Sequence, residues 1–164
     1  MEDYYDEIAP GYNDLRSKEQ IEKALFVEHI LPYEEDSTIL DVGCGTGISM
    51  SVFKCFVTGL EPSSKMIEQN PFKDKVVQGF AEAIPFEDNS FDYVVSITAA
   101  QNFKNIQTAV SEIKRVAKKG CAITILSRSK KKDLLYKELS KLFNVIKQYK
   151  IGVDSVFLCF SNKS

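Results

Sequence analysis

The chain has 164 residues and a formal net charge of −2, and 44% of its residues are hydrophobic. This length predicts one domain (1–164) with a core of its own, and the nearly balanced charge argues against a dedicated nucleic-acid-binding module. The sequence lacks an apolar run of about 18 residues, and its acidic, aromatic start (Met1–Glu7) does not resemble a signal peptide, so we expect a cytoplasmic protein without a membrane span.

The cysteines and the histidine are placed too far apart to suggest a metal site. The four cysteines form no C-x-x-C pair, and His29 has no partner nearby in the sequence. We therefore expect reduced thiols and no bound metal.

The N-terminal region predicts a flap followed by a helix. Residues 1–17 are too apolar for a disordered tail and interrupted by Pro10-Gly11, so they form either a flap over a site or an arm packed on the core. The core would then be 18–164. Apolar residues at helical spacing predict a helix over 18–31, with Pro32 just beyond its end.

A strand over 38–42 leads into glycines at alternate positions, Gly43, Gly45 and Gly47. Glycines here let the backbone approach a ligand that any Cβ would hold away. Residues 48–53 then predict a helix whose first N–H groups point back into the loop. A strand, a glycine turn and a helix N-terminus together predict a small-molecule site at the carboxyl edge of an open α/β sheet.

A second strand, over 55–61, ends in an acid, Glu61, which follows Asp41 by 20 residues. In a nucleotide-binding βαβ unit, an acid at about this spacing accepts hydrogen bonds from the two ribose hydroxyls. The alternative is an acid that ends the strand by chance.

The rest of the chain alternates strands with helices. We expect a helix over 62–70, strands over 75–78 and 91–97, a helix over 105–118 terminated by Gly120, a strand over 121–126, a helix over 131–142, and strands over 143–149 and 155–160. This order predicts an α/β fold with a doubly wound sheet of about seven strands, mostly parallel, with helices on both faces. The short final connection predicts an antiparallel C-terminal strand.

Five segments carry a resemblance to a known family: Leu40–Gly47, Gly59–Ser63 with Met66, Ala81–Phe86, Ser90–Ser96 and Glu112–Val116. In this order and spacing, from about Tyr4 to Phe160, the chain resembles Rossmann-like class I S-adenosylmethionine-dependent methyltransferases, in the group that includes quinone-biosynthesis enzymes. The resemblance implies an enzyme that transfers a methyl group from S-adenosyl-L-methionine to an acceptor by in-line displacement.

The resemblance also implies roles for the matching positions. The methionine part of the cofactor would be held by Asp41, Gly43, Cys44, Gly45, Thr46 and Gly47. Glu61 would bind both ribose hydroxyls, and Pro62 and Met66 would sandwich the adenine. The adenine edge would meet Ala81 and Glu82, the sulfonium would lie over Ser96, Ile97 and Thr98, and Tyr12 or Tyr4 would close over the cofactor.

The chain departs from the family at two places. Phe80 stands where an aspartate often accepts from the adenine amino group, and Gln101-Asn102 stands where many relatives carry a histidine pair. Without these imidazoles, the resemblance supplies no general base at the second position, and a reactive sulfonium mainly requires alignment and exclusion of water. Gln101, Asn102 and Tyr12 stay as candidates; the amide pair either orients the acceptor or caps the next helix.

The sequence also bears on two rival functions. The glycine spacing G-x-G-x-G, with Ile48 next, argues against a nicotinamide-dependent oxidoreductase, whose fingerprint is G-x-G-x-x-G. The other rival is a cofactor-binding subunit of a partner-dependent RNA or protein methyltransferase, because some related enzymes require a small zinc-ribbon activator.

The acceptor is expected to be a small molecule in an open, shallow site, and RNA or a protein activator are the alternative partners. A basic run, Arg128 with Lys130–Lys132, follows a predicted strand end near the same rim. Such a run either meets a phosphate or an acidic substrate or forms a solvated helix start.

Overall fold

The computed structural model describes residues 17–161, so Tyr4 and Tyr12 of the expected flap lie outside the described residues. A helix over 17–30 comes first. The strands that follow are β1 (Thr38–Val42), β2 (Phe56–Glu61), β3 (Val76–Gln78), β4 (Phe91–Ser96), β5 (Ala117–Leu126), β6 (Val145–Ile151) and β7 (Asp154–Phe160). The helices between them are α2 (Ser64–Gln69), α3 (Ile106–Val116) and α4 (Lys132–Leu142), with 3-10 turns η1 (Ser49–Ser51), η2 (Lys73–Lys75) and η3 (Ala100–Asn102).

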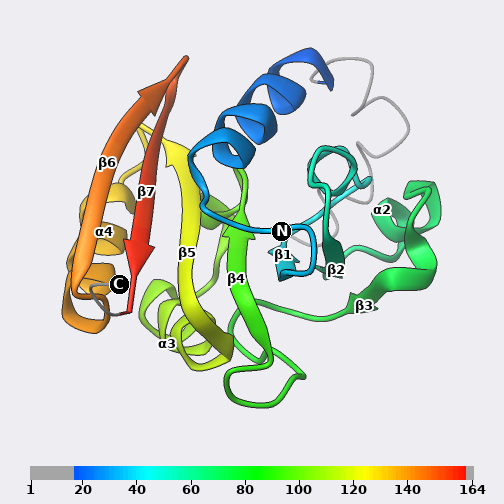
Figure 1. The fold of residues 1–164 in the computed structure, drawn as a ribbon. Helices are drawn as coiled ribbons and strands as arrows, with labels where there is room; N and C mark the ends of the chain where they lie inside the picture. The colour runs from blue at the N-terminus through cyan, green and yellow to red at the C-terminus, as the bar shows by residue number, and fades with distance from the viewer. Residues whose placement is uncertain (1–16, 162–164) are drawn as a thin grey trace.

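The strands form one seven-stranded sheet in the order β3-β2-β1-β4-β5-β7-β6 (Figure 1). Strands β1 to β5 pair in parallel, whereas β7 runs antiparallel to both of its neighbours. The predicted doubly wound sheet and its antiparallel C-terminal strand are therefore confirmed. That strand does not form the margin of the sheet, however, because it lies between β5 and β6.

Helices cover both faces of this sheet, as predicted. Neighbouring residues of β1 point to opposite faces, so Leu40 belongs to the hydrophobic cluster under α3 and α4, and Ile39 to the cluster under the N-terminal helix (Figure 1). α3 buries one face through residues at helical spacing, namely Ile106, Ala109, Val110, Ile113 and Val116. Within the described part of the chain, no helix is long and apolar enough to cross a membrane.

The prediction of a helix over 48–53 was wrong, because this segment forms only the 3-10 turn η1. Its residues favour other bonds: the Ser49 hydroxyl donates to Asp41, and the Ser51 hydroxyl donates to the Ile48 carbonyl at 2.7 Å. Serine side chains that bond nearby polar groups compete with regular helix formation.

The predicted role of Gly120 as a helix terminator was also wrong. β5 begins at Ala117, directly after α3, and Gly120 lies inside the strand. A Cβ at this position would lie 2.1 Å from the carbonyl oxygen of Cys159. The glycine therefore allows β7 to approach β5, which is a contact between distant segments that local sequence does not reveal.

The core contacts of α4 give a stability prediction. Leu139→Ala should lower the free energy of unfolding by about 2–5 kcal/mol, because Leu139 is fully buried against α3 and the sheet. The matched control is Leu134→Ala in the same helix, where the side chain is 45% exposed and the change should be small. Urea unfolding measures both variants, and equal losses would contradict the packing described.

Candidate active site

A pocket opens at the carboxyl ends of β1, β2 and β4, the edge where open α/β sheets bind ligands. Four segments line it: the glycine loop after β1, the start of α2, the loop after β3 and the segment after β4. Gln20 of the N-terminal helix completes the lining on one side.

The three glycines of the loop have left-handed backbones, with φ of +77° at Gly43, +53° at Gly45 and +88° at Gly47. A Cβ at Gly43 would lie 2.5 Å from the Ala99 Cβ, and one at Gly47 would lie 2.3 Å from the Asn70 Oδ1. A Cβ at Gly45 would meet no heavy atom within 4 Å, and Gly45 lines the pocket. Two of the glycines therefore serve close packing, and the middle one opens to the ligand side.

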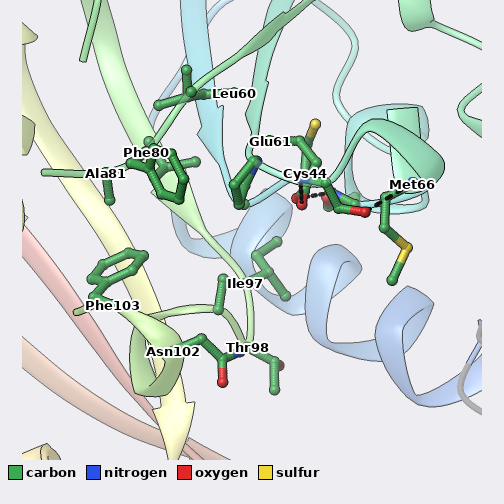
Figure 2. A pocket seen from close by; sticks show the side chains of 18 of the residues that line it. Cys44, Leu60, Glu61, Met66, Phe80, Ala81, Ile97, Thr98, Asn102 and Phe103 are labelled. Atoms are coloured by element: carbon green, nitrogen blue, oxygen red, sulfur yellow. Dashed lines mark hydrogen bonds between the residues drawn. The ribbon is translucent and has the colours of Figure 1, made fainter. Parts of the chain in front are cut away.

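Glu61 stands at the wall of the pocket, in the middle of its length (Figure 2). Its Oε2 accepts a hydrogen bond from the Gly45 N–H at 2.9 Å, and its Oε1 accepts one from the Ser63 N–H at 3.0 Å. The side chain is 7% exposed. These two backbone donors fix the orientation of the carboxylate between the glycine loop and the start of α2.

Asp41 lies behind the glycine loop and does not line the pocket. Its carboxylate is fully buried and accepts from the Ser49 hydroxyl, while its Oδ1 has no hydrogen-bond partner among the described residues. Burial raises the pKa of Asp41 to about 7; the Ser49 hydrogen bond acts in the opposite direction, and the charge of Glu61 raises the pKa further.

The far end of the pocket is apolar and aromatic. Figure 2 shows Leu60, Phe80, Ala81 and Phe103 gathered there, whereas Met66 lies beyond Glu61 at the opposite end. The Lys104 ammonium stands 4.5 Å from the centre of the Phe80 ring. Met66, expected to stack on the adenine, and Ala81, expected at the adenine edge, thus lie at different ends of the pocket.

An ion pair on α3 holds the loop that carries Ala81. The Glu112 Oε2 accepts from the Ile84 N–H at 2.8 Å, and the Arg115 guanidinium donates to the carbonyl oxygens of Ile84 at 2.9 Å and Phe86 at 2.7 Å. The Arg115 hydrogen bonds hold the pKa of Glu112 below its usual value. The Glu112–Val116 motif therefore shapes the pocket without lining it.

The segment after β4 separates the two amide candidates. Asn102 lines the pocket, whereas Gln101 does not, and its Nε2 donates to the Thr98 carbonyl at 2.8 Å. The cap of α3 is instead Asn105, whose side chain accepts from the Thr108 N–H and whose own N–H donates to Glu82 at 3.0 Å. The structure thus places one amide in the pocket, and neither Gln101 nor Asn102 at the helix cap.

Lys131 fits neither interpretation of the basic run, since its ammonium neither faces a ligand site nor is left to solvent. Its ammonium donates to the carbonyl oxygens of Gln101 at 3.0 Å and Phe103 at 2.6 Å, so it fixes the end of η3. Arg128 and Lys130 are exposed.

The pocket brings together most of the residues expected to bind the cofactor: Gly43, Cys44, Gly45, Thr46, Glu61, Pro62, Met66, Ala81, Glu82 and Ile97. Gly47 and Ser96 lie outside the lining, as Asp41 does. Within residues 17–161, no three His, Cys, Asp or Glu side chains are grouped to hold a metal.

Several lining residues were not predicted, among them Gln20, Ser63, Phe103 and Lys104. A signal for Gln20 was present, because it shares the buried helix face of Ala24, Val27 and Leu31, where a polar residue needs a partner. Phe103 and Lys104 follow η3, and their position depends on a turn that no local pattern marked.

Comparison with known proteins gives a family model, described as a methyltransferase domain, that matches residues 40–125. An uncharacterized protein of Methanocaldococcus jannaschii is 32% identical over 123 residues, which cover 72% of this chain and 47% of that protein. A demethylmenaquinone methyltransferase of Staphylococcus haemolyticus is 36% identical over 119 residues, 65% of this chain and 50% of that enzyme. The chain thus spans about half the length of the curated relatives it matches.

Solved structures share the fold over nearly the whole chain. A SAM-dependent methyltransferase from Thermotoga maritima superposes with a TM-score of 0.78 at 21% identity, covering 99% of this chain and 100% of that one. A methyltransferase solved in complex with the Trm112 methyltransferase activator of Haloferax volcanii gives a TM-score of 0.83 at 15% identity, covering 97% and 98%. Together with the family match, these likenesses confirm the resemblance predicted from the five motifs.

The raised pKa of Asp41 predicts a pH-dependent stability. The folded state keeps the proton up to about pH 7, whereas the unfolded chain releases it near 3.8, so this contribution is complete below about pH 4 and is lost as the pH rises through 7. Asp41→Asn should abolish the contribution, whose size is roughly 4 kcal/mol at most. Urea unfolding from acid to mild base measures it as the difference between wild type and variant. Asp36→Asn, at an exposed position, is the control, and parallel profiles for wild type and Asp41→Asn would refute this assignment.

The glycine loop gives a second prediction. Gly45→Ala should lose about 1–2 kcal/mol of unfolding free energy, the cost of a left-handed alanine. Gly47→Ala should lose more, because its Cβ would displace the Asn70 side chain, which donates to the Gly45 carbonyl at 3.3 Å. Chemical denaturation of both variants tests the order, and Asn70→Ala should recover part of the loss in the Gly47→Ala background. A larger loss of unfolding free energy for Gly45→Ala than for Gly47→Ala would contradict the packing described.

Proposed function

This chain belongs to the methyltransferase domain family, and from that membership we propose that it is an S-adenosyl-L-methionine-dependent methyltransferase whose cofactor lies in the pocket described above. The observation that carries the proposal is the Glu61 carboxylate, which Gly45 and Ser63 orient at the pocket wall between the glycine loop and an apolar end. This arrangement matches a molecule with a polar amino-acid part, a diol and a flat base.

The residues present fit these three parts. Glu61 would accept hydrogen bonds from the ribose hydroxyls. The apolar end formed by Leu60, Ala81 and Phe103 would hold the base, which places it away from Met66. The open side of Gly45 leaves room for the methionine part to approach the loop backbone.

When bound, the cofactor supplies a methyl group on a reactive sulfonium. The contribution of the chain is then to orient an acceptor and to exclude water, for which Ile97, Ala99 and Phe103 supply apolar lining. Asn102, the polar amide on this lining, would orient the acceptor by hydrogen bonding. A general base would add to the rate only where the acceptor must lose a proton.

For the acceptor we propose a small molecule. The demethylmenaquinone methyltransferases among the relatives are named for a quinone acceptor rather than for an RNA or a protein, and this supports the proposed class of acceptor. The four cysteines are all free thiols, which supports a cytoplasmic location.

A second candidate is a partner-dependent methyltransferase acting on RNA or protein. The observation that favours it is the likeness to a methyltransferase solved in complex with the Trm112 activator. Methyl transfer from labelled cofactor to small-molecule and RNA extracts separates the two, with the isolated chain compared with the chain purified together with its cellular partners. Activity that depends on a partner would favour the second candidate.

Cofactor binding is tested by titration calorimetry with S-adenosylhomocysteine, the demethylated product. Glu61→Ala should weaken binding by about 1.5–3 kcal/mol, the contribution of hydrogen bonds to a charged group. Glu68→Ala, at an exposed position of α2, is the matched control and should bind as wild type does. Binding of NADH without binding of S-adenosylhomocysteine would overturn the proposed function. An unchanged affinity of Glu61→Ala would show that Glu61 is not the ribose ligand.

A further inference from the structure

Thr98, the second residue after β4, has an unusual backbone for its residue type. Its φ is +52°, in the left-handed region, and its side chain is β-branched and 8% exposed. Such a conformation is sterically unfavourable for threonine and persists where the surroundings impose it. Thr98 also lines the pocket beside Ile97 and Asn102 (Figure 2), so the imposed conformation shapes the floor of the site.

Hydrogen bonds from β5 and β7 impose this conformation. The Thr98 hydroxyl donates to the Asp154 Oδ2 at 2.8 Å, and the Thr98 N–H donates to the Thr124 hydroxyl at 2.7 Å. The Thr124 hydroxyl in turn donates to the same Asp154 oxygen at 3.2 Å. Asp154, the first residue of β7, is fully buried and therefore gathers both polar groups of Thr98 through one carboxylate.

The second oxygen of this carboxylate binds the N-terminal helix. The Lys23 ammonium lies 3.0 Å from the Asp154 Oδ1, and both side chains are almost completely buried. Lys23 also contacts Glu19 at 2.6 Å. Gln20 stands one turn before Lys23 on the same helix and lines the pocket, so the ion pair fixes the helix that supplies one wall of the site.

A buried ion pair is seldom more stabilising than apolar side chains of similar volume. Its presence here is explained better by the geometry it imposes than by stability alone. From the first position of β7, Asp154 thus joins that strand to two segments that do not pair with it in the sheet, the segment after β4 and the N-terminal helix.

We propose that Asp154 is a positioning residue of the pocket: it holds Thr98 in its left-handed conformation and, through Lys23, keeps Gln20 at the pocket wall. The geometry stands independently of the ligand, whereas the effect on cofactor affinity rests on the proposed function. The β6–β7 hairpin thereby fixes the floor of the pocket around Thr98, although no residue of the hairpin lines the pocket.

The test asks whether adding Thr98→Gly to Asp154→Ala reverses or deepens the effect of the first substitution. Asp154→Ala should raise amide hydrogen exchange over 97–103 and weaken S-adenosylhomocysteine binding by about tenfold, comparable to the cost of an unsupported left-handed residue. Adding Thr98→Gly should reverse both changes in part, because glycine adopts positive φ without support. Were Asp154 important for stability alone, the second substitution would add a further loss, and that result would overturn the proposal.

Two controls stand outside the pocket. Asn89→Gly relaxes the other left-handed non-glycine residue of the described chain, at an exposed turn, and should leave exchange over 97–103 unchanged. Glu138→Gln breaks an ion pair on α4 with Lys141 and should affect exchange in α4 alone. If either control reproduces the effect of Asp154→Ala, the positioning role is refuted.

Two further outcomes are separable. If the wild-type protein does not bind S-adenosylhomocysteine, the proposed function fails, and amide hydrogen exchange over 97–103 still decides the role of Asp154. If Asp154→Ala does not fold, Asp154→Asn keeps the shape of the side chain and one acceptor oxygen, and the same comparison with and without Thr98→Gly applies. Loss that deepens on adding Thr98→Gly overturns the proposal there too.

Discussion

The close approach of the glycine loop to the end of β2 is the constraint on which the rest of the site depends. The N–H groups of Gly43 and Cys44 both donate to the Leu60 carbonyl, at 2.7 and 3.2 Å, and the next glycine donates to Glu61. Side chains at Gly43 or Gly47 would force the loop away. Since the loop, the acid and the start of α2 are joined through these contacts, the pocket wall forms as one unit.

The parts of the fold that sequence predicts are those with a local cause. Apolar residues dominate the buried strands β1 and β4 and the second part of β5 (121–126), and α3 has a clear helical repeat of apolar residues. The glycine loop and Glu61 are equally local, because alternate glycines and a strand-terminal acid can be seen in one short stretch. The core of the pocket could therefore be anticipated before its shape was known.

The remainder of the site depends on contacts between distant residues. Thr98 and Asp154 are 56 positions apart, and Lys131 reaches a carbonyl 28 positions away. Nothing in the residues around Thr98 indicates a left-handed backbone, since its support comes from β5 and β7. In the same way, the residues next to Gly120 predict a helix terminator, whereas the physical reason for this glycine is the Cys159 carbonyl on another strand.

The position of β7 has a consequence for the order of assembly. β6 is made before β7 but reaches the sheet through β7 alone, because β7 stands between it and β5. The two-residue turn at Gly152, with φ of +54°, lets the two strands pair locally as a hairpin. The hairpin would then join the sheet as one body, bringing Asp154 to Thr98 in the same event. Closure of the sheet and completion of the pocket floor are thus coupled, because both require the same hairpin to be in place.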